Sequence, residues 1–207
     1  MPVATYLLLG LNLVGYLSRI DPGSDRAGGV LNEITITTVI TAARSAFFHA
    51  NLLQFAINAM FLWLFGGTVE DQLGRLRFAA LYLIGGVTAA MLPEVIEPTW
   101  QGPTLGGSLA IAAVIGAYFV LFPNAKVLML VPIPMALHEV PAAILLTVWC
   151  AAQFLALIAV LAPADVPDTT LGLALSAYVL AFAMGAALCL ALRRRERARV
   201  EWWEATR

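Results

Sequence analysis

Long apolar stretches separated by short polar segments make up most of this chain. A helix needs roughly 20 consecutive apolar residues to cross the hydrocarbon core of a bilayer. Six stretches approach that length, at about residues 3–17, 46–67, 78–92, 107–122, 141–162 and 171–192. The first, third and fourth are short for an isolated span, but neighbouring helices can shield their ends inside a bundle. The pattern therefore predicts six membrane-spanning helices.

The segments between these stretches differ in character. Residues 18–45 begin with the turn-forming Asp21-Pro22-Gly23 and continue with an amphipathic stretch, which we expect to lie in the membrane interface. We expect a short charged turn at residues 68–77. Further loops are expected at residues 93–105, 123–140 and 163–170. One transmembrane domain, residues 1–192, is then followed by a basic tail, residues 193–207, whose Trp202 and Trp203 should approach the lipid headgroups.

Composition supports a membrane protein. Hydrophobic residues make up 61% of the 207 residues and charged residues only 12%, whereas a soluble domain averages about 45–50% and about 25%. The net charge of −1 gives no reason to expect a nucleic-acid partner. Cys150 and Cys189 lie inside apolar runs without metal-type spacing, so we expect no metal and no cofactor. The first helix lacks the charged leading segment and the cleavage site of a signal peptide. We therefore interpret it as a helix that is retained in the protein.

The distribution of Lys and Arg predicts the orientation in the membrane. The turn at 68–77, the loop at 123–140 and the tail hold most of the 12 basic residues. The other side holds Arg19, Arg26 and Arg44. We therefore expect both chain ends on the cytoplasmic face, in a bacterial inner (plasma) membrane.

Polar side chains within the spans are candidates for function, because burying them in hydrocarbon is costly. The candidates are His49, Asn51, Gln54 and Asn58 on the second span, Ser108 at the start of the fourth, and Ser176 and Tyr178 on the sixth. Gln54 and Asn58 are four residues apart and share a helix face. Their amides can bond a neighbouring helix or stabilise an oxyanion. Ser108 is either a nucleophile or a small residue at a close helix contact.

Three stretches together resemble the rhomboid intramembrane serine proteases. They are "FFHANLLQFAINAMFLWLFGGTVEDQLGRLRFAALYLIGG", "LGGSLAIAAVIGAYFVLFPNAKV" and "SAYVLAFAMGAAL". The first carries the series Asn58, Trp63, Gly66, Glu70 and Gly74, and the second carries Gly106-x-Ser108 followed by Gly116-Ala117-Tyr118. The resemblance implies an all-α, polytopic membrane protein with a six-transmembrane-helix rhomboid-like bundle.

The same resemblance implies roles for individual residues. Ser108 falls on the family's nucleophile and Asn58 on its oxyanion-hole asparagine. Gln54 replaces an oxyanion-hole histidine, Leu109 replaces the glycine after the nucleophile, and Tyr178 replaces the catalytic histidine. Glu70 and His49 fall on a family acidic residue and on a non-catalytic histidine, respectively.

These replacements bear directly on catalysis. A serine needs an adjacent base to attack an amide, and a phenol, with an ordinary pKa near 10, is a poor proton acceptor. In subtilisin, loss of the serine or histidine costs a factor of roughly 10⁶ in turnover. His138 is expected on the opposite side of the membrane, and His49 lies nine residues before Asn58, about 13 Å along a helix. Leu109 is expected to crowd a substrate carbonyl.

We therefore interpret Ser108 as a helix N-cap or packing residue, with the Tyr178 hydroxyl on Ser108 or Asn58. The expected function is non-catalytic: binding transmembrane helices of client proteins, or serving as a subunit of a larger membrane complex, with lipid as the other contact. The resemblance places lateral entry between the second and fifth helices, near Phe61, Leu64, Trp149 and Phe154. The alternative is a divergent intramembrane serine endopeptidase with Ser108 as nucleophile and Tyr178 or His49 in an unusual role. No predicted span carries an Asp, Glu, Lys or Arg side chain that would mark an ion path, which argues against a channel or transporter.

Overall fold

The computed structural model describes residues 1–18, 36–97, 106–132, 135–161 and 169–192. Several expectations lie outside these residues: the Asp21-Pro22-Gly23 turn, most of the loops at 93–105 and 163–170, and the tail with Trp202 and Trp203.

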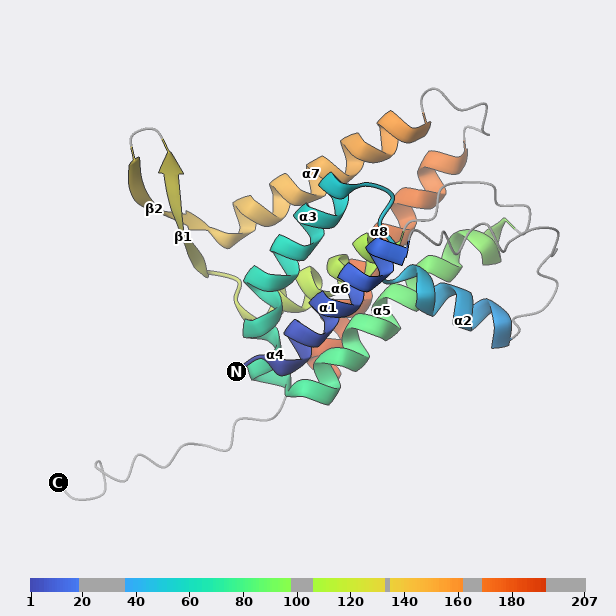
Figure 1. Ribbon diagram of the computed structural model, residues 1–207, viewed down its shortest axis with the longest axis horizontal. Coiled ribbons are helices and arrows are strands. Elements are labelled where there is room, and N and C mark those ends of the chain that lie inside the picture. Colours follow the sequence, from blue (N-terminus) through green and yellow to red (C-terminus); the bar gives the residue numbers. More distant parts are fainter. Residues whose placement is uncertain (19–35, 98–105, 133–134, 162–168, 193–207) are drawn as a thin grey trace, which may run out of the picture.

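The described chain is predominantly helical (Figure 1). In order, the helices are α1 (Val3–Ser18), α2 (Ile36–Ser45), α3 (Leu52–Phe61), α4 (Gly67–Leu73), α5 (Arg75–Ile96), α6 (Gly107–Leu121), α7 (Ala142–Leu161) and α8 (Thr169–Leu192). A π-helical segment, Leu62–Gly66, joins α3 and α4 into one continuous rod. Within the described ranges, four helices are long and apolar enough to span a membrane: Leu52–Leu73, Arg75–Pro93, Ala142–Ala159 and Thr169–Leu192. The apolar helices α1 and α6 are shorter, and they match the first and fourth predicted spans.

The boundaries of the second and third spans differ from the prediction. The second helix begins at Leu52 rather than at residue 46, and residues 68–77 form no extended turn. Helix continues to Leu73, Gly74 alone breaks it, and α5 begins at Arg75. Gly74 has a φ of 85°, which a residue without Cβ adopts at little cost. As a result α5 has 22 residues, and the third span is not short.

The predicted loop at 123–140 contains a β-hairpin. Strands β1 (Lys126–Pro132) and β2 (Met135–Pro141) pair antiparallel, with Val127 opposite Val140. An exposed ion pair of 2.9 Å joins Lys126 and Glu139 across the strands, and such pairs contribute little stability. The amphipathic stretch of the first loop does form a helix, α2, and its position in the membrane interface stays a prediction.

Helix α6 is the centre of the bundle. All residues from Gly107 to Tyr118 are buried, and α6 contacts α3, α4, α5, α7 and α8. Its sequence is accordingly apolar on every side. Two glycines allow the closest approach, to α8: a Cβ on Gly116 would overlap the carbonyl of Phe182, and a Cβ on Gly185 would overlap the carbonyl of Ala113. This confirms close helix contact as the reason for glycine at position 116.

Two contacts place the start of α1 and the end of α8 at the same end of the bundle. Buried Glu70 on α4 accepts hydrogen bonds from the backbone N–H groups of Ala4 (3.0 Å) and Thr5 (2.7 Å) and from the Thr5 hydroxyl (2.8 Å). It therefore caps the amino end of α1, where a negative charge is favoured. Near the start of α5, Arg77 donates to the carbonyl of Leu192, the last residue of α8, at 2.9 Å.

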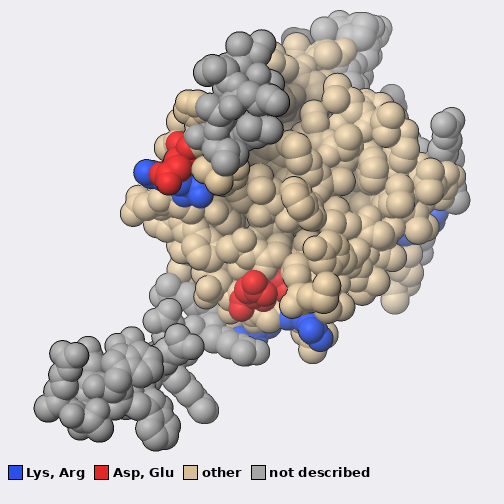
Figure 2. Space-filling model, turned by 60° about the vertical axis from the view of Figure 1, so that its left-hand side comes forward, with Lys and Arg blue, Asp and Glu red and all other residues tan. Residues whose placement is uncertain are grey.

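The surface has the character of one that faces lipid. Large apolar side chains are exposed along several helices, among them Leu7 and Leu17 on α1 and Val148 on α7. Figure 2 shows a broad face on which nearly all described atoms belong to uncharged residues, with charged groups gathered in small clusters. Hydrocarbon tolerates such a face and water does not. The chain is an integral membrane protein.

Candidate functional site

Ser108 lies one residue inside the amino end of α6. Gly106 is the N-cap, with a φ of 59°, and no side chain caps the helix. The Gly107 N–H donates to the carbonyl of Phe48 at 2.9 Å, so the helix start is tied to the segment before α3. Ser108 is therefore not an N-cap, and of its two predicted roles only that of a packing residue agrees with the structure. The Ser108 side chain has no exposed surface and points into the bundle.

Two amide groups donate to the Ser108 hydroxyl. Asn58 Nδ2 lies 2.8 Å from Ser108 Oγ, and Gln54 Nε2 lies 3.1 Å from the same oxygen. The Tyr178 side chain on α8 interacts with the Ser108 side chain. Helices α3, α6 and α8 thus bring together Gln54, Asn58, Ser108 and Tyr178, four of the residues to which the resemblance assigns roles. The structure also bears out the expected contact between Tyr178 and Ser108.

A fifth residue completes this polar cluster. Gln153 on α7 donates through Nε2 to Asn58 Oδ1 at 3.0 Å, and only 8% of Gln153 is exposed. The sequence analysis did not single it out. The sequence did contain a signal for it, because Gln153 is an amide within an otherwise apolar predicted span, and unpaired polar groups are costly there.

Neither amide that donates to the Ser108 oxygen is a base. A hydroxyl has two acceptor lone pairs and one proton. The amides of Gln54 and Asn58 engage the acceptor side of the oxygen, and the neighbouring hydroxyl belongs to Tyr178, a weak proton acceptor at its ordinary pKa near 10. In this arrangement polar side chains link α3 to α6 and α3 to α7. Leu109 lies fully buried in the apolar core, and its crowding of a substrate carbonyl stays a prediction.

His49 lies closer to Ser108 than its position in the sequence indicated. The segment before α3 folds back, so that a Cβ on Gly107 would lie 2.8 Å from His49 Nε2. His49 is 4% exposed, its Nδ1 lies 3.3 Å from the Phe47 carbonyl, and its Nε2 has no hydrogen-bond partner within the described part of the chain. Burial lowers the His49 pKa to about 4, although the Phe47 carbonyl opposes that shift. The imidazole is therefore neutral at pH 7. His138, by contrast, is exposed on β2.

The contact between α3 and α7 is closed. The rings of Phe61 and Trp149 lie 5.9 Å apart, and Trp149 lies 6.5 Å from the ring of Tyr178. Phe61 and Trp149, two of the residues expected to line the lateral entry, thus contact each other, whereas Phe154 is 41% exposed. The lateral entry between these helices stays a prediction.

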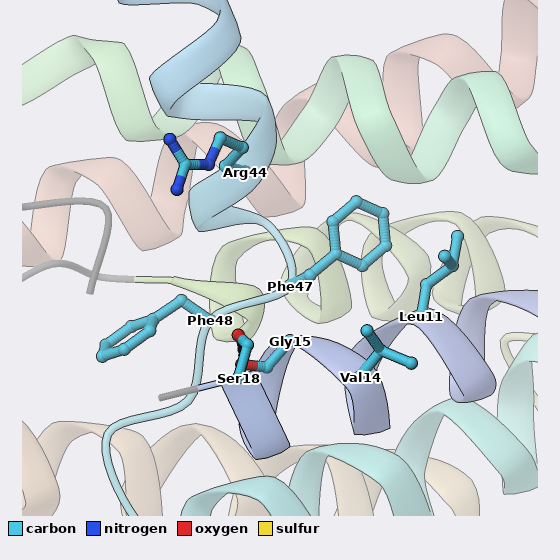
Figure 3. Close-up of a pocket in the computed structure, with 7 residues that line it drawn as sticks. All are labelled: Leu11, Val14, Gly15, Ser18, Arg44, Phe47 and Phe48. Carbon is cyan, nitrogen blue, oxygen red and sulfur yellow. Dashed lines mark hydrogen bonds between the residues drawn. The ribbon is translucent and has the colours of Figure 1, made fainter. Parts of the chain in front are cut away.

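A separate pocket of about 240 Å³ opens between the ends of α1 and α2. Its walls are Leu11, Val14, Gly15, Ser18, Arg44, Phe47 and Phe48. Figure 3 shows the α1 residues on one side, Phe47 and Phe48 on the segment that follows α2, and Arg44 on α2 itself. None of the residues around Ser108 lines it, so this pocket is not part of the polar cluster. Within the described residues, no group of three or more His, Cys, Asp or Glu side chains is arranged to hold a metal ion.

Comparison with known proteins agrees with the arrangement of these helices. The model of the rhomboid domain family matches residues 35–195. Rhomboid protein 1, mitochondrial, from Saccharomyces cerevisiae is 32% identical over 110 residues, which cover 51% of this chain and 32% of that protein. Presenilin-associated rhomboid-like protein A, mitochondrial, from Danio rerio is 32% identical over 105 residues, covering 49% of this chain and 27% of the relative. The presenilin-associated rhomboid-like protein, mitochondrial, from Homo sapiens is 33% identical over 84 residues, which cover 40% of this chain and 22% of that protein.

The matched regions thus span about a third or less of these relatives' lengths. The family match itself extends over most of the chain, from the end of the first loop to the end of α8, and includes Ser108 and every residue bonded to it. The chain belongs to the rhomboid family.

Proposed function

We propose that this protein is a non-catalytic member of its family that binds transmembrane helices, either of client proteins or of partners in a membrane complex. The observation that carries the proposal is the environment of Ser108. Its oxygen accepts two amide hydrogen bonds, and the side chain on α8 that interacts with it is a phenol, not an imidazole. A serine held in this way lacks the proton acceptor that attack on an amide requires.

The α3/α7 contact is the proposed binding site. It is a contact between two helices within the membrane, closed by Phe61 and Trp149. Small shifts of α7 would open it toward lipid, because the outer face of α7, including Phe154 and Val148, is already exposed. Without turnover, a bound helix has no chemical step that releases it.

Photo-crosslinking tests the proposal directly. A photoreactive amino acid at Phe154, beside the α3/α7 contact, should capture specific membrane proteins in native membranes. The same probe at Leu7, exposed on α1, should capture none of them. Identical product patterns from the two positions, or no protein product at Phe154, would rule out helix binding at this site.

The alternative function, a divergent serine endopeptidase, is favoured by one observation. His49 is a neutral imidazole whose Nε2 is unpartnered in the described structure, and it packs against the residue before Ser108. A fluorophosphonate probe tests for an activated serine. We expect no labelling of the purified protein. Labelling that disappears in both Ser108→Ala and His49→Gln would establish a protease and overturn the non-catalytic proposal.

A further inference from the structure

Helix α7 is attached to the bundle by a single narrow stripe. Its buried residues are Ala142, Leu146, Trp149, Gln153, Leu157 and Leu161. They recur every three or four positions, which is the spacing of one helix face. The intervening residues that the structure describes are exposed or half-buried. Separation of α7 from α3 would break the Phe61–Trp149 ring contact and the Gln153–Asn58 hydrogen bond, and it would leave the outer face of α7 unchanged.

The centre of the stripe is polar. Gln153 Nε2 donates to Asn58 Oδ1, which makes this bond a direct link between α7 and α3. One turn earlier, Trp149 is only 2% exposed. Its buried indole N–H has no acceptor among the described residues. An unmade hydrogen bond of this kind is unfavourable within hydrocarbon, where water is not available to replace the missing partner.

A helix that enters between α3 and α7 has to replace the hydrogen bond that it breaks between them. It breaks the Gln153–Asn58 bond, which leaves a donor on Gln153 and an acceptor on Asn58. An apolar helix satisfies neither group. A Lys or Arg side chain brings only donors, and a carboxylate is costly to bury in the membrane. A carboxamide carries both an acceptor oxygen and two N–H donors, so it can bond Gln153 and Asn58 together and supply an acceptor to Trp149.

We propose that the α3/α7 contact is a docking site selective for a transmembrane helix with an Asn or Gln side chain at the depth of Trp149 and Gln153. The inference rests on the proposed helix-binding function and specifies its ligand. Before a helix binds, the Gln153 amide makes the hydrogen bond to Asn58 that the incoming amide would make afterwards. Trp149 supplies the additional donor that only the bound helix satisfies.

The test uses the purified full-length protein in nanodiscs and two synthetic transmembrane peptides. Each peptide has about 20 Leu and Ala residues. One has a central Asn, and the matched peptide has Leu there. Binding is followed by energy transfer from labelled protein to labelled peptide, at dilutions where the Asn peptide alone shows no self-association. We expect the Asn peptide to bind about fivefold more tightly or better, as a single interhelical hydrogen bond predicts.

Two variants locate the selectivity. Trp149→Phe keeps an aromatic ring and removes the N–H, and Gln153→Met keeps the side-chain length and removes the amide. Each should reduce the preference for Asn without weakening the binding of the Leu peptide. Trp63→Phe is the matched control, because Trp63 is 60% exposed on the surface of the α3–α4 rod, and it should retain the full preference.

The possible outcomes separate the two proposals. If the wild-type protein binds both peptides equally, helix binding stands and the carboxamide inference is wrong. If neither peptide binds, both proposals fail. If Trp149→Phe and Gln153→Met both keep the full preference, the selectivity arises elsewhere and the site assigned here is wrong. The comparison of the two peptides on the wild-type protein needs no variant to fold.

Discussion

At the scale of single residues, the partners of the Ser108 hydroxyl decide what its chemistry can be. Its neighbours Gln54 and Asn58 are donors, and Tyr178 is a hydroxyl. The same arrangement makes Ser108 an acceptor for two amide groups of α3. Its contribution to stability is therefore measurable independently of any catalytic activity.

Replacing Ser108 with Ala should destabilise the protein by about 1–3 kcal/mol, because buried amide and hydroxyl groups lose a partner. Unfolding of the purified protein in mixed micelles measures the change. Ser176→Ala is the control, since the Ser176 hydroxyl donates only to the Leu173 carbonyl of its own helix, at 2.7 Å, and we expect a change within about 0.5 kcal/mol. Equal stability of Ser108→Ala and wild type would show that the polar cluster does not hold the helices together.

The environment of His49 predicts a pH dependence of stability. Its pKa is lowered to about 4 in the folded protein, compared with about 6.5 for an unperturbed imidazole. The unfolded state therefore binds more protons between these values, and stability falls as the pH falls from about 6.5 to about 4. The full effect is on the order of 3 kcal/mol.

The His49 contribution is measured as the difference between wild type and variant. The unfolding free energy is followed from pH 7.5 to 4.5 for wild type, His49→Gln and His138→Gln. We expect only His49→Gln to flatten the curve in this window, because carboxylate effects are common to all three proteins. A wild-type slope retained in His49→Gln would assign the pH dependence to other groups.

At the scale of elements, glycine positions distinguish helix contacts from helix surface. Gly185 and Gly172 both lie on α8, but only Gly185 faces α6. A Cβ on Gly185 would overlap the Ala113 carbonyl, whereas a Cβ on Gly172 would meet nothing within 4 Å. The two residues are a matched pair for testing the α6/α8 contact.

Gly185→Ala should destabilise the protein by about 1–3 kcal/mol, as overpacking against a backbone typically does. Gly172→Ala should be neutral or stabilising by up to about 1 kcal/mol, because alanine favours the helix. Thermal unfolding in detergent compares the two. A similar effect of both substitutions would mean that the close approach of α8 to α6 does not govern stability.

The elements also show which local features can be predicted. Long apolar stretches indicated the central parts of the spans, because a bilayer imposes a minimum apolar length. The single-residue break at Gly74 was not predicted, since charged residues around it have the composition of an ordinary loop. The β-hairpin at Lys126–Pro141 was also missed, because strand pairing depends on partners that a short apolar run does not identify.

At the scale of the whole molecule, the contacts of α1 and α8 bear on topology. Glu70 binds the amino end of α1, and Arg77 binds the carbonyl of Leu192 at the end of α8. An even number of membrane crossings places these two ends on one side. Which side that is remains a prediction from the distribution of Lys and Arg.

Fusion of a reporter that is active only in the cytoplasm should give signal at either end of the chain when the protein is expressed in bacteria. A reporter active only outside the cytoplasm should give signal at neither end. Signal on opposite faces for the two ends would contradict the even number of crossings. Two extracytoplasmic ends would preserve that number and reverse the predicted orientation.

Apolar patterning and motif spacing were enough to predict a membrane environment and most of the candidate site residues. Apolar length and sparse charge require a bilayer, and the spacing of Asn58, Ser108 and Tyr178 matches a family pattern because each residue sits at a set position on its own helix. The contacts between residues far apart in the chain became visible in the folded protein. The fold placed Gln153 on Asn58, across 95 positions of sequence, and His49 against Gly107. These contacts depend on the packing of separate helices and on the path of a connecting segment, neither of which local periodicity specifies.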